Sequence, residues 1–140
     1  MKDPIQRRNT VTLASDLGKL PPQAVDAEEL VLGALMKEKN AIIKVINLLT
    51  QESFYKDSHK YIYEAIYQLF NDNEPIDILT VTKRLKKNEK LELVGGAYYI
   101  AQLTNKIVSS ANIEAHSAYI AQASMARQLI ELSSETLRKA

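Results

Sequence analysis

Cysteine is absent from this sequence of 140 residues. Its absence excludes a disulfide framework, a cysteine nucleophile and any zinc site built on thiolates, and it fits a reducing compartment. Tryptophan is also absent, and aromatic residues make up only 6% of the chain. No apolar run approaches the ~20 residues that a membrane span needs, and the N-terminus lacks the apolar stretch of a signal peptide. We therefore expect a cytoplasmic protein.

Glycine is scarce, and its positions exclude a nucleotide-hydrolysing site. The four glycines are Gly18, Gly33, Gly95 and Gly96. None of them belongs to a glycine-rich loop that continues into Lys-Ser or Lys-Thr, the pattern that cradles phosphates. We therefore expect no ATPase site within this chain.

Histidine is equally scarce, and nothing indicates catalysis or metal binding. His59 and His116 have no other histidine or cysteine at the spacing of metal ligands. We expect a structural role for His59, and a surface or interface position for His116. No serine has a base at the spacing of a known nucleophile motif. The sequence thus predicts no catalytic, cofactor-binding or metal-binding residue.

Excess charge of one sign is also lacking, because the net charge is only +1. The single basic run consists of Lys83, Arg84, Lys86, Lys87 and Lys90. It could contact DNA or an acidic partner, or it could be a solvated helix end, where cations favour the C-terminal dipole. Acidic residues interleave with it and no aromatic platform for bases is evident. The solvated helix end is favoured, and a nucleic-acid-binding module that uses residues 83–90 stays as an alternative.

What the chain does contain is a series of apolar stripes at helical spacing, without the alternation of a strand. Asp26, Asp77 and Asn112 are placed to cap the first, fourth and last helices. Asp57 or Ser58 could cap the third. The apolar segment 42–49 predicts a short second helix, and Gly95-Gly96 marks the start of a fifth. We predict an all-α fold with a disordered arm (1–20), a small globular head (21–94) and a helical hairpin (95–140).

The last predicted helix is too long for a domain of this size. It contains neither glycine nor proline from Ile113 onward, and at ~1.5 Å per residue it would be about 40 Å long. A compact domain of this length has a radius of only roughly 13 Å, so the helix should project. Its apolar residues surround most of its circumference: Ala115, Ala118, Tyr119, Ala121, Ala123, Met125, Ala126, Leu129, Ile130 and Leu132. The fifth helix could cover one side, and the remainder predicts contact with another chain.

The order and spacing of several short blocks resemble one family. The blocks are Pro21-Pro22-Gln23, residues 27–35, Phe54-Tyr55 with His59, residues 62–66, Glu74–Asp77 with Thr80-Val81 and Leu85, Leu91-Glu92, Val94-Gly95-Gly96, Ala111–Glu114, and Tyr119-Ile120. Together they resemble the N-terminal domain of DnaB-type bacterial replicative helicases. The resemblance covers about residues 21–140. One departure is the loop 107–110, where the family often has a proline.

The resemblance implies a role in assembly and docking. In that family, N-terminal domains pair through their hairpins, and three pairs form a collar on a hexameric ring. The collar offers docking surfaces for the helicase-binding domain of primase and, in some systems, for the helicase loader. Unwinding of DNA with ATP and Mg²⁺ would belong to a RecA-like motor that this chain lacks. We therefore expect an N-terminal segment that ends before the linker and the motor.

Self-association would then involve the hairpin. We expect five residues to contribute to the dimer or partner interface: Tyr119, Ile120, Ala123, Arg127 and Ile130. A related alternative is the helicase-binding domain of primase, which shares a similar helical architecture. The blocks 27–35 and 74–77 favour the helicase.

Overall fold

The computed structural model describes residues 21–106 and 112–139. The predicted arm 1–20 and the loop 107–110 therefore lie outside the described residues. Within the described part the chain is helical and contains no strand, so the predicted all-α class is confirmed. The α-helices are α2 (Val25–Lys37), α3 (Asp57–Asn71), α4 (Ile78–Lys87), α5 (Gly96–Asn105) and α6 (Ile113–Lys139). Two short 3-10 helices, η1 (Ala41–Lys44) and η2 (Gln51–Ser53), lie between α2 and α3.

The apolar faces of α2, α3, α4 and α5 build one core around α2, which packs against the other three helices. The largest fully buried side chains of this core come from every part of the head: Phe54, Tyr63, Leu32, Leu35, Leu49, Ile62, Ile66, Leu69, Leu85, Ile100 and Leu103. Tyr63 is buried together with its hydroxyl, which donates a hydrogen bond to the carbonyl of Leu49 (3.0 Å). This bond satisfies a polar group that burial would otherwise penalise.

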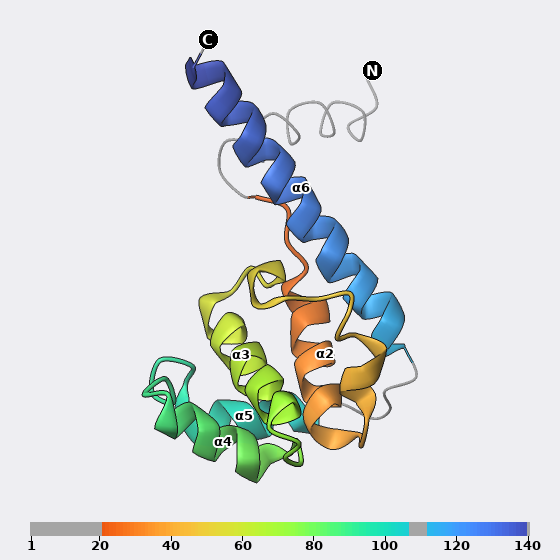
Figure 1. Ribbon diagram of the computed structural model, residues 1–140, viewed down its shortest axis with the longest axis vertical. Coiled ribbons are helices and arrows are strands. Elements are labelled where there is room, and N and C mark those ends of the chain that lie inside the picture. The colour runs from red at the N-terminus through yellow and green to blue at the C-terminus, as the bar shows by residue number, and fades with distance from the viewer. Residues whose placement is uncertain (1–20, 107–111, 140) are drawn as a thin grey trace, which may run out of the picture.

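α6 begins on the head and then projects from it (Figure 1). Its first half packs against α2 and against the two 3-10 helices. Every side chain from 131 to 138 is exposed. The predicted projection of this helix is therefore confirmed.

The predicted partner of α6 is wrong. The sequence suggested a hairpin in which the fifth helix lies along the last one. In the structure α5 packs against α2 and α4, within the head, whereas the principal helical neighbour of α6 is α2. The reason lies in the apolar face of α5, since Ile100 and Leu103 are fully buried in the common core. The head therefore extends through α5, beyond the boundary predicted after residue 94.

The second predicted helix, over residues 42–49, is only partly correct. The segment forms the short 3-10 helix η1, followed by hydrogen-bonded turns as far as Leu49. It starts from Asn40, whose backbone is left-handed (φ 66°). Ile42, Ile43 and Val45 are β-branched, and such side chains lose rotamer freedom in a regular helix. Core packing of Ile42, Val45 and Leu49 holds the irregular segment in place.

Of the predicted caps, Asp77 is confirmed. Its side chain accepts a hydrogen bond from the Thr80 N–H (2.9 Å), and the Thr80 hydroxyl accepts one from the Asp77 N–H (3.0 Å). This reciprocal pair is a capping box at the start of α4. Asn112 directly precedes α6, and its carbonyl accepts the helical bond from the His116 N–H (3.0 Å). A cap made by the Asn112 side chain stays a prediction.

The other predicted caps are wrong. Asp26 lies inside the first turn of α2, whose N-cap position is Ala24 and has no side-chain cap. The Asp26 carboxylate can still interact favourably with the helix dipole there. Neither Asp57 nor Ser58 caps α3, because the helix already begins at Asp57 and its N-cap position is Lys56.

Candidate interaction surface

A buried polar cluster ties α2, α3 and α5 together. His59 is fully buried and Glu28 is 1% exposed. The Nδ1 atom of His59 lies 2.7 Å from Oε1 of Glu28, and its Nε2 atom lies 2.6 Å from the hydroxyl of Tyr99. The His59 and Tyr99 rings are also stacked. An ionised carboxylate only accepts hydrogen bonds, so it pairs with the tautomer that has a proton on Nδ1, and in that tautomer the Tyr99 hydroxyl donates to Nε2.

Glu28 also holds the backbone just ahead of α3. Its Oε2 accepts a hydrogen bond from the Tyr55 N–H (2.7 Å), and its Oε1 accepts a longer one from the Lys56 N–H (3.4 Å). A carboxylate in this position satisfies backbone donors just ahead of α3 and favours the positive end of its dipole.

Partial burial makes the Tyr99 hydroxyl a weaker acid than an exposed tyrosine. Burial, followed by the negative charges of Glu29 and Glu28, raises the pKa of Tyr99 to about 12. Gly95, the N-cap residue of the helix that carries Tyr99, has a φ of 105°, a backbone conformation that is open mainly to glycine. A Cβ at Gly95 would lie 3.0 Å from the Cβ of Tyr99. The cluster is structural in character, since no substrate can reach a histidine that is fully buried.

The sequence indicated part of this cluster. The predicted structural role of His59 agrees with its burial and its two hydrogen bonds. Glu28 and Tyr99 were missed as its partners, because they are separated from His59 by 31 and 40 residues. Glu28, inside an apolar stripe of α2, was the available signal, since a lone carboxylate on a buried face needs a partner.

One face of α6 lies against the head. Ile113, Ser117, Ile120 and Ser124 are buried and recur at helical spacing. Ile120, predicted as an interface residue, is only 1% exposed and belongs to the core of this chain. In this arrangement it is unavailable to another chain, which corrects that part of the prediction.

Arg127 ends the face of α6 that lies on the head. Its guanidinium donates hydrogen bonds to the carbonyls of Pro22 (2.8 Å) and Ser53 (3.0 Å), and it lies over the ring of Tyr55, 5.4 Å from the centroid. Arg127 was also predicted to contact another chain, yet the structure assigns its donors to contacts within this one. It joins the start of the head, η2 and α6.

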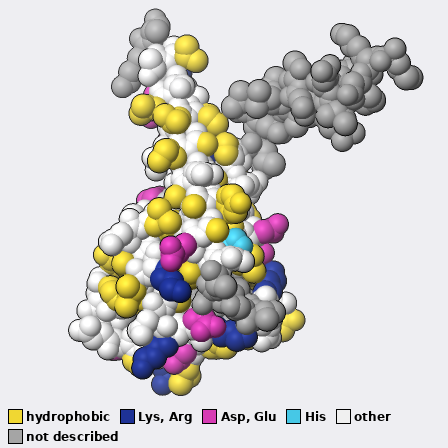
Figure 2. Space-filling model, turned by 90° about the vertical axis from the view of Figure 1, so that its right-hand side faces the viewer, with side chains coloured by type: hydrophobic (Ala, Val, Ile, Leu, Met, Phe, Trp, Pro, Cys, Tyr) yellow, Lys and Arg dark blue, Asp and Glu magenta, His cyan; other side chains and the backbone are white. Residues whose placement is uncertain are grey.

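The opposite face of α6 is exposed and apolar. Met125, Leu129 and Leu132 lie at positions i, i+4 and i+7, so they share one side of the helix, and each is more than 60% exposed. Tyr119 and Leu137 are exposed as well. Figure 2 shows hydrophobic side chains recurring along the projecting arm. We call the exposed side chains of Met125, Leu129 and Leu132 the α6 apolar face; Tyr119 and Leu137 lie on another side of the helix.

The predicted interface residues therefore separate into three groups. Tyr119 is exposed, so its predicted contact with another chain stays a prediction. Ala123 and Ile130 are partly exposed, whereas Ile120 and Arg127 serve the fold of the chain itself. His116, expected at the surface or an interface, is half-buried. Sequence periodicity missed Met125, Leu129 and Leu132 as a distinct face because nearly every side of α6 carries apolar residues.

The basic residues between positions 83 and 90 likewise divide into those that contact other side chains of the chain and those that are exposed. Arg84 forms ion pairs with Asp72 (3.0 Å) and Glu74 (3.5 Å), and the Lys90 ammonium lies 4.8 Å from the centroid of the Tyr61 ring. Lys83, Lys86 and Lys87 remain exposed.

Metal binding and membrane insertion find no support in the described residues. Residues 21–106 and 112–139 contain no group of three or more His, Cys, Asp or Glu side chains arranged to hold a metal ion. In the same ranges, no helix combines the length and the apolar character that crossing a membrane would require.

Comparison with known proteins agrees with this architecture. The family model of the DnaB-like helicase N-terminal domain matches residues 20–122. A replicative DNA helicase DnaB from Rhodothermus marinus is 41% identical over 120 residues, which cover 86% of this chain and 13% of that protein. Replicative DNA helicase DnaC from Bacillus subtilis is 38% identical over 112 residues, covering 80% of this chain and 25% of the relative.

A solved structure agrees at the level of the fold. The crystal structure of the N-terminal domain of DnaB helicase from Mycobacterium tuberculosis has a TM-score of 0.82 and 32% sequence identity, and the match covers 84% of this chain and 82% of that one. The chain thus corresponds to between 13% and 25% of the length of the two curated relatives above, and to most of one separately crystallised domain. These matches favour the helicase over the related primase domain. This chain belongs to the family of DnaB-like helicase N-terminal domains.

Proposed function

We propose that the chain is the assembly and docking domain of an ATP-dependent replicative DNA helicase in the cytoplasm. The observation that carries the proposal is the α6 apolar face on a helix that projects beyond its own core. A monomer gains nothing from holding Met125, Leu129 and Leu132 in water, whereas a second copy could bury them. We assign ATP hydrolysis with Mg²⁺, and the unwinding of DNA that it drives, to a RecA-like part outside this chain.

Pairing of two α6 helices would create a symmetric contact, because a dimer with twofold symmetry uses the same surface from both copies. Three such pairs would form a collar on a hexameric ring. Leu129 and Leu132 lie near the middle of the exposed stretch and would form the centre of the contact. Their burial contributes on the order of 1.5–3 kcal/mol for each side chain.

Light scattering and sedimentation equilibrium test the pairing. We expect the wild-type chain to form dimers or larger species, and Leu129→Asp to shift it to monomer. Leu93→Asp is the matched control, because Leu93 is an equally exposed leucine (64%, against 61% for Leu129) that lies on the head. A wild-type chain that is monomeric at high concentration would contradict the proposal, as would a Leu129→Asp chain that associates normally.

Docking of primase is the second part of the proposal, and the helicase loader is a further expected partner. A pull-down with the C-terminal domain of the cognate primase tests it directly. We expect capture by the wild-type chain. Failure of capture while self-association persists would remove primase docking and leave the assembly role intact.

A further inference from the structure

The outward face of α4 carries positive charge that the fold does not use. Leu79, Lys83 and Lys86 lie at positions i, i+4 and i+7 of this helix, so they share one side of it. All three side chains are exposed. Among the ion pairs within residues 21–106 and 112–139, none includes Lys83 or Lys86.

Arg84, on another side of α4, is by contrast engaged by contacts within the chain. Arg84 points toward α3, where Gln68, Asp72 and Glu74 accept its hydrogen bonds. The positive charge of Arg84 is therefore more than compensated by its two carboxylate partners. Lys83 and Lys86, on the other side, are exposed and form no ion pair among the described residues, so their charges are available to an acidic partner.

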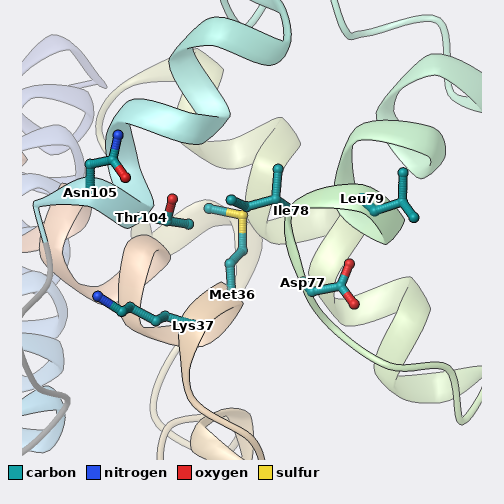
Figure 3. Close-up of a pocket in the computed structure, with 7 residues that line it drawn as sticks. All are labelled: Met36, Lys37, Asp77, Ile78, Leu79, Thr104 and Asn105. Carbon is teal, nitrogen blue, oxygen red and sulfur yellow. The ribbon is translucent and has the colours of Figure 1, made fainter.

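An open hollow lies beside this charge. It has a volume of about 540 Å³ and is lined by Met36, Lys37, Asp77, Ile78, Leu79, Thr104 and Asn105. Three elements contribute to it, namely the end of α2, the start of α4 and the end of α5. In Figure 3 the Ile78 side chain points toward Met36, and Leu79 lies farther along α4. Leu79 is 62% exposed and Ile78 is 40% exposed, so apolar surface is open to solvent here.

We propose that this surface, which comprises the hollow and the side chains of Leu79, Lys83 and Lys86 and is called the α4 docking face, binds an acidic segment of a partner protein. An aliphatic side chain of the partner would enter the hollow between Met36 and Leu79. Carboxylates that follow it would lie over Lys83 and Lys86, which are about 6 and 10 Å from Leu79 along the helix axis at ~1.5 Å per residue. The apolar contact contributes affinity, and the ion pairs contribute orientation and speed of association.

A protein segment fits this face better than a nucleic acid does. A single strand is usually held by a continuous basic groove with aromatic side chains on which bases stack. Here Lys83 and Lys86 share their side of α4 with the aliphatic side chain of Leu79. The carboxylate of Asp77 borders the hollow. That carboxylate would repel a phosphate chain, whereas the apolar part of a peptide can pass over it.

This inference goes beyond the assembly role and does not depend on it. α4 packs against α2, α3 and α5, whereas the main contacts of α6 are with α2, η1 and η2. Self-association through α6 and peptide binding on α4 can therefore succeed or fail separately, and light scattering of each α4 variant measures the first directly.

Selection from a phage-displayed library of random dodecapeptides on the immobilised chain tests the proposal without prior choice of partner. We expect the enriched peptides to combine an aliphatic residue with two or more acidic residues. Amide chemical shifts in an NMR titration with the best peptide should change at residues 79–87 and around Met36 and Thr104. Enriched peptides without acidic character, or shifts confined to another surface, would overturn the proposal.

Affinity of the selected peptide, measured by fluorescence anisotropy, gives the decisive comparison. Lys83→Glu combined with Lys86→Glu should weaken binding roughly tenfold, since it replaces two favourable charge pairs by repulsive ones. Lys44→Glu combined with Arg138→Glu is the matched control, because both residues are exposed and the net charge changes equally. Leu79→Ser should weaken binding as well. Equal effects of the two charge-reversed pairs would overturn the proposal, as would displacement of the peptide by oligothymidylate with higher affinity.

Discussion

The head encloses a core of buried side chains, whereas the outer end of α6 exposes all of its side chains to solvent. In the head even the ionisable side chains of Glu28 and His59 are enclosed, and both form hydrogen bonds with defined partners. Along 131–138 every side chain is exposed, including leucines. The core side chains of the head therefore have their partners within the chain, whereas the leucines at the end of α6 lack them. The difference separates residues that maintain the fold from residues that are available for association.

The largest expected effect comes from removing the buried carboxylate. Glu28→Ala should lower the free energy of unfolding by about 3–5 kcal/mol, because His59 and the N–H of Tyr55 lose a buried partner. Glu29→Ala is the matched control in the adjacent position, since Glu29 pairs with the half-exposed Lys106 and should contribute no more than about 1 kcal/mol. Urea denaturation followed by circular dichroism measures both. Similar losses for the two variants would show that the buried cluster is not special.

The next largest effect separates the two faces of α6. Ile120→Ala should cost about 2–5 kcal/mol of stability, because it leaves a cavity in the core. Leu129→Ala should change stability by less than about 0.5 kcal/mol, since its side chain lies in solvent. Thermal unfolding of the dilute chain compares them. If Leu129→Ala destabilises the monomer as strongly as Ile120→Ala does, the division of the helix into an inner and an outer face is wrong.

Helix caps provide a smaller contrast within the head. Asp77→Ala should reduce stability by about 1 kcal/mol, because the Thr80 N–H loses its cap. Asp26→Ala should cost only about 0.3 kcal/mol, since Asp26 interacts with the α2 dipole but forms no cap. Guanidinium titration of both variants resolves this difference. The reverse order would restore Asp26 as the cap that the sequence suggested.

The smallest contrast concerns the pH dependence of stability that the hydroxyls of Tyr63 and the half-buried Tyr99 contribute, which is absent at neutral pH. Burial raises the pKa of Tyr63 and Tyr99 to about 12 in each case, above the ordinary value of 10.0. A raised pKa means that the folded chain favours the protonated phenol, so stability is unaffected below pH 10 and falls as pH rises toward 12. Tyr99→Phe should make this alkaline loss less steep. Unfolding measured across that range, alongside tyrosinate absorbance, tests the expectation; an unchanged slope in Tyr99→Phe would contradict it.

Local sequence signals predicted much of the fold, and long-range packing explains the rest. Apolar spacing and the Asp77 and Gly95-Gly96 signals placed α2, α4, α5 and the projecting α6. The partner of α5 could not be predicted, because a helix pattern shows which face is apolar but not which neighbour covers it. The same holds for Ile120 and Arg127. Only the packing of α6 on the head distinguishes them from Tyr119 and Leu129.

Arg127 anchors the middle of α6 to the head, and the helix projects freely beyond it. Its hydrogen bonds to Pro22 and Ser53 fix the last point at which α6 is held by the head. Beyond it the helix continues for about 18 Å, at ~1.5 Å per residue, to Lys139. A tilt of about 10° at Arg127 would therefore move the tip by about 3 Å, and a rotation there would turn the row of exposed leucines toward a different neighbour. In a pair of copies joined through α6, as proposed above, the direction in which this guanidinium holds the helix would therefore affect the separation of the two heads.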